Sequence, residues 1–230
     1  MIKSEGEKDV MKAALFDLDG TLLNRDASIE FFIEQQYERL KSVFGSISKE
    51  QYRTRFIQLD KRGYVWKDCV YQQLVEEFHF VHITWEELLQ DYLNEFKHSC
   101  VPFPNLIPML EQLKRDQLAL GIITNGYGQF QMDTIKALAI EHYFDVILVS
   151  EWAGMKKPHP QLFLNAIEKL NVLPHECVFI GDHPVNDVKG AQHVGMKGIW
   201  KKDKQWQYVE ADAIVEYLLE IPLFIDSFSQ

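Results

Sequence analysis

The strongest constraint on the fold of this chain is a repeated alternation of short apolar runs with amphipathic stretches of helical period. The apolar runs occupy residues 13–18, 118–124, 146–149, 177–180 and 198–200. Helical periods lie between them, at residues 106–117, 129–140, 161–170 and 186–194. Apolar runs without regular polar alternation are typical of strands buried on both faces of a parallel sheet. The alternation therefore predicts an α/β fold with a doubly wound, Rossmann-like parallel-sheet core.

One long segment interrupts this alternation. Residues 24–100 contain no strand-like run and show only helical patterning, rich in aromatic and charged side chains. We therefore predict that residues 1–23 form the first strand and its turn, residues 24–100 an inserted all-helical cap domain, and residues 101–230 the rest of the core. An insertion directly after the first strand is placed to act as a lid over whatever the strand ends carry.

Charge and cysteine content exclude several classes of protein. The chain has 34 acidic and 24 basic side chains, a net charge of −10, which disfavours nucleic acid as a partner because phosphate backbones need clustered Lys and Arg. Its three cysteines form no CxxC pair, so no zinc or redox motif is indicated, and free thiols fit a reducing compartment. The polar N-terminus and the lack of a long apolar run predict a cytoplasmic protein with no membrane partner.

Two carboxylates follow the first apolar run, in the stretch DLDGT. Asp17 and Asp19 stand where a buried strand ends, and in open α/β sheets ligands bind at the carboxyl ends of strands. Together with the close backbone approach that Gly20 allows, they are suited to hold a metal and to supply a nucleophile. The alternative is a plain turn, since Asp-Gly is a common turn dipeptide. A buried carboxylate without a partner is unfavourable, which favours the functional interpretation.

The second apolar run also ends in polar residues. Thr124, Asn125 and Gly126 offer a hydroxyl, an amide and backbone N–H groups at the start of a helix, which is a suitable cradle for an anion. The alternative interpretation is a simple helix N-cap formed by the Thr or the Asn.

Two further motifs follow in the second half of the chain. Lys157 precedes a proline that is suited to begin a helix, and a lysine in this position is also common on plain surfaces. Asp182 and Asp187 stand five residues apart directly after the run at 177–180, a spacing that fits metal ligation and support of the ligands. The alternative for this pair is a capped helix start.

Taken together and in this order, the four motifs resemble those of the haloacid dehalogenase-like hydrolase superfamily: DxDGT, a Thr or Ser at the second strand, a Lys, and GDx4D. The resemblance covers residues 13–19 and about 104–225, and residues 24–98 resemble the helical cap inserted in that family. The stretches ITNG, LVSEWAGMKKPHP and FIGDHPVNDVKGAQHVGM are similar to those of phosphatases and pyrimidine nucleotidases of the superfamily.

The resemblance implies a chemistry for each motif. Asp17 is expected to be the nucleophile that forms an aspartyl-phosphate, and Asp19 the acid and base that serves the leaving group and then water. Lys157 is expected to neutralise phosphoryl oxygens, while Thr124 and the N–H of Asn125 bind the remaining ones.

The resemblance also implies Mg²⁺ as the cofactor, because a carboxylate that approaches a phosphate dianion needs a cation and Mg²⁺ prefers oxygen ligands. The expected ligands are the Asp17 and Asp182 side chains and the backbone carbonyl of Asp19. Asp187 is expected to stand behind them and to orient Lys157 or a metal-bound water.

Substrate choice is expected to lie in the cap, in the Gly-centred loop at residues 60–66. Lys61, Arg62 and Tyr64 could read an anion or stack on a ring, and the alternative is an ordinary surface loop whose aromatics pack inside the cap. Residues 49–67 contain six basic and two acidic side chains, a local charge of +4, which predicts that the loop attracts a phosphorylated anion.

Four functions compete for this set of motifs. The first is a Mg²⁺-dependent phosphatase of a small phosphorylated metabolite, with a nucleoside monophosphate as one candidate. A phosphomutase uses the same core chemistry, and a 2-haloacid dehalogenase is disfavoured because it needs neither Asp19 nor the acidic fourth motif. The last is a non-catalytic module that binds a phosphorylated ligand or a protein. The sequence leaves open the substrate and the choice between monomer and homodimer.

Overall fold

The computed structural model describes residues 10–229, so the part of the predicted first core segment before residue 10 lies outside it. The chain divides into two compact units. The core unit comprises the described residues up to 24 and from 102 onward, and the helical unit comprises Arg25–Val101. The bounds of the helical unit differ by one residue at each end from those expected from sequence.

The core unit is built on one six-stranded sheet in the order β3-β2-β1-β4-β5-β6, and every neighbouring pair is parallel. The strands are β1 (Ala13–Phe16), β2 (Ala119–Thr124), β3 (Val146–Val149), β4 (Cys177–Gly181), β5 (Lys197–Lys201) and β6 (Ala213–Val215). The predicted α/β parallel-sheet core is therefore confirmed. The edge strand β6 was not predicted, because its apolar run has only three residues.

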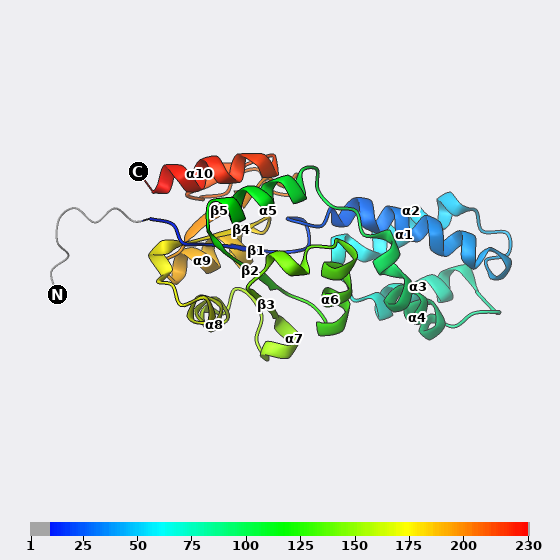
Figure 1. Ribbon diagram of the computed structural model, residues 1–230. Coiled ribbons are helices and arrows are strands. Elements are labelled where there is room, and N and C mark those ends of the chain that lie inside the picture. The colour runs from blue at the N-terminus through cyan, green and yellow to red at the C-terminus, as the bar shows by residue number, and fades with distance from the viewer. Residues whose placement is uncertain (1–9, 230) are drawn as a thin grey trace. The chain divides into compact units, whose positions relative to one another are not determined.

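Helices cover both faces of this sheet. They are α5 (Leu106–Arg115), α6 (Gly128–Ala137), α7 (Ser150–Ala153), α8 (Pro160–Leu170), α9 (Gly190–His193) and α10 (Ile221–Phe228). In Figure 1, α5 and α10 lie together on one side of the sheet, and α8 and α9 lie on the other. The helix expected at residues 186–194 is a π-helical segment, Pro184–Lys189, that continues into α9.

The apolar runs form strands because both of their faces are buried. On one face Leu15, Ile123 and Phe179 pack with Leu162 and Phe163 of α8, and none of the five is measurably exposed. Burial of each such side chain contributes about 1.5–3 kcal/mol. This packing fixes α8 against the centre of the sheet, and it holds the ends of the central strands in place for the site described below.

The helical unit contains four main helices, which are α1 (Arg25–Arg39), α2 (Lys49–Asp60), α3 (Lys67–Phe78) and α4 (Trp85–Glu95). Its interior is aromatic, with Tyr52 and Tyr71 among its fully buried side chains. Both hydroxyls donate to the buried amide oxygen of Gln36, over 2.8 and 3.1 Å respectively, so the polar atoms of this interior are satisfied. Within residues 10–229, no helix is both long enough and apolar enough to cross a membrane.

Candidate active site

The register of the three central strands brings the predicted motifs to one edge of the sheet. Phe16 of β1 is paired with Ile122 of β2 on one side and with Ile180 of β4 on the other. The polar residues Asp17, Thr124 and Asp182 lie one or two positions beyond these partners, so they emerge at the same edge. This is the carboxyl edge, where open parallel sheets bind their ligands.

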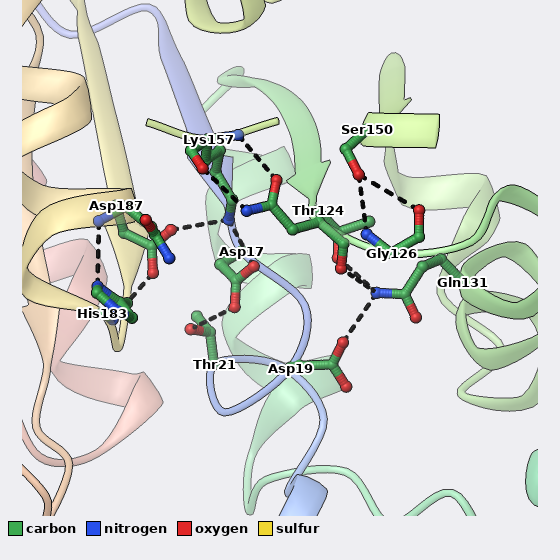
Figure 2. A network of polar contacts seen from close by, with 12 residues as sticks. Asp17, Asp19, Thr21, Thr124, Gly126, Gln131, Ser150, Lys157, His183 and Asp187 are labelled. Atoms are coloured by element: carbon green, nitrogen blue, oxygen red, sulfur yellow. Dashed lines mark hydrogen bonds and ion pairs between the residues drawn. The ribbon is translucent and has the colours of Figure 1, made fainter. Parts of the chain in front are cut away.

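A buried lysine stands at the centre of this edge. Lys157 Nζ lies 2.6 Å from Asp17 Oδ1 and 2.8 Å from Asp187 Oδ1, and all three residues are buried (Figure 2). Removing charges from water is costly unless they are paired, and here one cation faces two anions. Three motifs that are distant in the sequence therefore meet in a single ion-pair cluster.

The electrostatics of this cluster show an excess of negative charge. Burial raises the pKa of Asp17 to about 7, with the Asp187 and Asp19 carboxylates adding to the rise and Lys157 opposing it. Burial also raises the pKa of Asp182, assisted by Asp17 and Asp187. For Lys157, burial acts to lower the pKa, but the Asp17 and Asp187 carboxylates outweigh it and hold the pKa above its ordinary value. Another cation bound at this cluster would therefore stabilise the ionised forms of its carboxyl groups.

The same carboxylates are suited to bind that cation. Asp17, Asp182 and Asp187 can each offer one oxygen such that the three oxygens lie within 4.8 Å of one another. An all-carboxylate set suits a hard divalent ion such as Mg²⁺ or Ca²⁺. Asp187 is thus placed to be a metal ligand in addition to pairing with Lys157. Gly20 makes room for this arrangement, since a Cβ there would lie 2.5 Å from Asp182 Oδ2 and its φ is +86°.

Asp19 is held on the other side of Asp17 by a residue that sequence reasoning missed. Gln131 of α6 donates from Nε2 to Asp19 Oδ2 over 2.8 Å and to Thr124 Oγ1 over 2.6 Å (Figure 2). A signal for it existed. Gln131 precedes Thr134 and Ile135 by three and four positions in the predicted helix, which places a polar side chain on the face that is buried.

Asn125 and Gly126 act differently from the expected anion cradle. The Asn125 side chain accepts from the backbone N of Lys157 over 2.8 Å and donates to its carbonyl over 3.1 Å, so it positions the lysine. The backbone N–H of Gly126 donates to Ser150 Oγ over 2.9 Å. In this structure the Gly126 N–H therefore already has an acceptor, the Ser150 hydroxyl on α7, and the expected role of Gly126 in phosphate binding stays a prediction.

His183 has a structural role in the fourth motif. Its Nδ1 accepts from the backbone N–H groups of Val185 and Asn186, each over 3.1 Å, and so caps the segment that follows. Its own backbone N–H donates to Asp187 Oδ2 over 2.9 Å (Figure 2). The turn therefore fixes the carboxylate of Asp187, whose other oxygen faces Lys157.

The predicted substrate loop lies in the helical unit, at the turn that follows α2. Lys61, Arg62 and Tyr64 are exposed, and Arg62 Nη2 lies 3.1 Å from Asp26 Oδ2. Their approach to Asp17 stays a prediction.

The local charge of +4 in this segment is balanced by carboxylates from other helices. The pairs are Lys49–Glu38, Arg53–Glu30, Arg55–Glu77 and Arg62–Asp26, and within the segment Lys67 pairs with the buried Asp60. A count along the sequence therefore overstates the positive field of the loop.

The fold and the site together define a class of protein, an α/β protein whose acidic centre with one lysine lies at the carboxyl edge of a parallel sheet. The family model of the haloacid dehalogenase-like hydrolases matches residues 14–201, and the chain belongs to this family. The resemblance drawn from the four motifs is thereby confirmed.

The individual relatives share between a quarter and about a third of their aligned residues with this chain. A glyceraldehyde 3-phosphate phosphatase of Methanopyrus kandleri is 35% identical over 109 residues, and the match spans about half of each chain, 47% of both. A phosphoserine phosphatase of Thermus thermophilus is 25% identical over 83% of this chain and 88% of the relative. The crystal structure of a HAD (haloacid dehalogenase-like) phosphatase from Thermococcus onnurineus superposes with a TM-score of 0.67 at 33% identity, covering 94% of this chain and 98% of that one.

Proposed function

We propose that this chain is a phosphatase that hydrolyses a monoester of a small phosphorylated metabolite through an aspartyl-phosphate. One observation carries the proposal: a buried Asp17 carboxylate is held by Lys157 at the strand edge, with a second carboxyl, Asp19, two residues away. A nucleophile and a separate acid are what phosphoryl transfer through a covalent intermediate requires.

In the first step an oxygen of Asp17 attacks phosphorus, and the bond from phosphorus to the ester oxygen breaks. Asp19 gives its proton to that oxygen, so the alcohol leaves neutral. Lys157 stays beside Asp17 and faces the negative charge of the phosphoryl group, while the Thr124 hydroxyl and the N–H of Asn125 donate to its oxygens.

In the second step water attacks the phosphorus of the aspartyl-phosphate. Asp19, now a carboxylate, accepts a proton from the water, and the bond from phosphorus to the Asp17 oxygen breaks. Inorganic phosphate leaves, Asp17 regains its carboxylate, and Asp19 regains its proton. One residue thus serves as acid and then as base, and the cycle returns to its starting state.

The residues that would hold Mg²⁺ are Asp17, Asp182 and Asp187, with the backbone carbonyl of Asp19 as a further oxygen. The fit rests on the three converging carboxylates and on the raised pKa of Asp17 and Asp182, which burial raises and the neighbouring carboxylates raise further. When bound, the ion supplies positive charge that lets an anionic nucleophile approach an anionic phosphoryl group.

The substrate is proposed to be small. The relatives named above act on glyceraldehyde 3-phosphate and on phosphoserine, both small phosphomonoesters. A nucleoside monophosphate remains a candidate of similar chemistry. Lys61, Arg62 and Tyr64 of the helical unit are the residues we propose to contact the part of the substrate beyond the phosphate.

The test is a panel of phosphate esters assayed for phosphate release in EDTA and in Mg²⁺. The panel contains glyceraldehyde 3-phosphate, phosphoserine and nucleoside monophosphates. We expect release from at least one ester in Mg²⁺ and loss of that release in Asp17→Asn, while Asp116→Asn, a change on the exposed end of α5, keeps it. In two parallel assays, isomerisation of a hexose phosphate without net phosphate release would indicate a phosphomutase instead, and Mg²⁺-independent halide release from a 2-haloacid would indicate a dehalogenase.

A further inference from the structure

Gln131 is a polar residue placed in the interior beside the site. It is 2% exposed, and its Nε2 lies within hydrogen-bond distance of three acceptors. These are Asp19 Oδ2 at 2.8 Å, Thr124 Oγ1 at 2.6 Å and the carbonyl oxygen of Asn125 at 3.3 Å (Figure 2). One side-chain amide therefore contacts the proposed acid, the proposed phosphoryl-binding hydroxyl and the backbone between β2 and α6.

The chemistry of these partners fixes the orientation of the amide. The backbone carbonyl of Asn125 can only accept, as can the carboxyl oxygen of Asp19 that carries no proton, so the group that faces them is the NH₂ of Gln131 and not its carbonyl. The amide does not titrate, so it remains a donor at any working pH.

The same orientation constrains the two catalytic partners. Because Thr124 Oγ1 accepts from Gln131, its own hydrogen is left to point toward another acceptor, such as a phosphoryl oxygen. Because Asp19 Oδ2 accepts from Gln131, Oδ1 is left as the oxygen that carries the transferable proton.

The fold holds Gln131 rigidly in this place. Gln131 lies in the first turn of α6, where its backbone N–H donates to the carbonyl of Tyr127 over 3.0 Å. Gly126 leaves the space into which the side chain packs, since a Cβ at that position would lie 2.9 Å from Gln131 Cδ. Placement on a helix turn, with the neighbouring backbone shaped around it, is what a precise polar contact needs.

We propose that Gln131 is a positioning residue that couples the acid–base carboxyl of Asp19 to the phosphoryl-binding hydroxyl of Thr124. The proposal rests on the proposed phosphatase function and deepens it. It assigns to Gln131 the orientation of the proton donor toward the leaving group, and it assigns no contact between Gln131 and the reacting atoms.

The test compares two phosphoryl donors, an ester and a mixed anhydride, whose leaving groups differ in their need for a proton. Glycerol phosphate must release an alkoxide oxygen, which needs protonation, whereas acetyl phosphate releases acetate, which does not. The measured quantity is kcat/KM, because it reports the steps up to the first phosphoryl transfer and excludes later hydrolysis of the aspartyl-phosphate. The variants are Gln131→Met and Gln131→Glu, both similar in shape to Gln and both unable to donate when the Glu is ionised.

We expect each Gln131 variant to lose about 100-fold in kcat/KM for glycerol phosphate, within the range of general acid catalysis, and only a few-fold for acetyl phosphate. The matched control is Gln129→Met on the same helix, whose exposed amide donates to Asp133 on the surface and whose loss should change neither value.

Each other outcome overturns the proposal. An equal loss on both phosphoryl donors would show a general structural role for Gln131, and no loss on either would show that Asp19 does not need the hydrogen bond from Gln131. If one variant fails to fold, as judged by circular dichroism, the other carries the test. Failure of the proposed function is seen separately, as the absence of phosphate release by the wild-type protein from the whole ester panel and from both phosphoryl donors before any variant is made.

Discussion

Replacement of Lys157 by methionine tests the electrostatic account of the site most directly. The change keeps the length of the side chain and removes the one cation that lies between Asp17 and Asp187, at 2.6 and 2.8 Å. Two buried carboxylates are then left without their partner. Breaking a buried ion pair by removal of one member costs about 3–5 kcal/mol of unfolding free energy.

The cost should depend on pH in a defined direction. With Lys157 present, the pKa of Asp17 is about 7 in the folded protein and 3.8 when unperturbed. Between these values the folded state holds a proton that the unfolded state has lost, so stability falls as pH rises, and the fall ends near pH 7. Without Lys157 the folded pKa of Asp17 is higher still, so the fall continues. The difference between wild type and variant should therefore widen by about 1.4 kcal/mol per pH unit above pH 7.

The assay is urea unfolding in EDTA at pH 6, 7, 8 and 9, followed by circular dichroism. The matched control is Lys114→Met, which removes an exposed lysine whose Nζ lies 3.1 Å from Asp145 Oδ2 and should cost at most about 1 kcal/mol at every pH. A Lys157→Met cost that is constant with pH, or no larger than that of the control, would refute the reasoning.

Four further predictions concern single positions. Mg²⁺ at a hundred times its Kd should add about 2.7 kcal/mol to the unfolding free energy, and Asp182→Asn should abolish that gain at the same concentration; an equal gain in the variant would remove Asp182 from the ligand set. Asn125→Ala should lower kcat/KM for phosphate release about tenfold, because two hydrogen bonds of about 1 kcal/mol each no longer hold the backbone of Lys157, and Asn125→Asp should recover part of the loss by keeping its acceptor. Gly20→Ala should lower the urea-unfolding free energy by about 1–3 kcal/mol, since its φ is +86° and the new Cβ would collide with Asp182; wild-type stability would contradict this. Asp60→Asn should lower the unfolding free energy by about 1–3 kcal/mol, because this 2%-exposed carboxylate accepts charge-assisted hydrogen bonds from two cationic side chains; a thermal-unfolding midpoint equal to wild type would count against it.

Much of the fold could be predicted from the sequence because burial on two faces leaves a local trace. The strands that contain Leu15, Ile123 and Phe179 are apolar up to their carboxyl ends, which marks the centre of the sheet. The strand β6 at the edge leaves only a weak trace, because its apolar run is three residues long.

The site was predictable where residues stand directly at strand ends, as Asp17 and Asp182 do, since parallel strands place their carboxyl ends together. Gln131 and Ser150 could not be found in this way. Their roles depend on how α6 and α7 pack against the end of β2, and that packing is a tertiary property.

The charge around the predicted substrate loop also depends on tertiary packing, so the sequence alone did not predict it. Arg55 and Glu77 are 22 residues apart in the sequence and pair at 2.6 Å. A charge count over residues 49–67 therefore includes the arginine and omits its carboxylate partner. Local charge predicts a local field only where no neighbouring element supplies counter-ions.

The contacts of Asn125 and Gly126 have a practical consequence for protein engineering. Gly126 is hydrogen-bonded to Ser150, and Asn125 is hydrogen-bonded to Lys157. This dipeptide therefore holds both ends of the segment between Ser150 and Lys157. Residues 152–156, most of them exposed, are thus enclosed between two fixed points. Ala153 and Met155 pack against the core and Gly154 ends α7 at φ +66°, so a combinatorial library confined to the exposed Trp152 and Lys156 would vary the surface while Lys157 keeps its position.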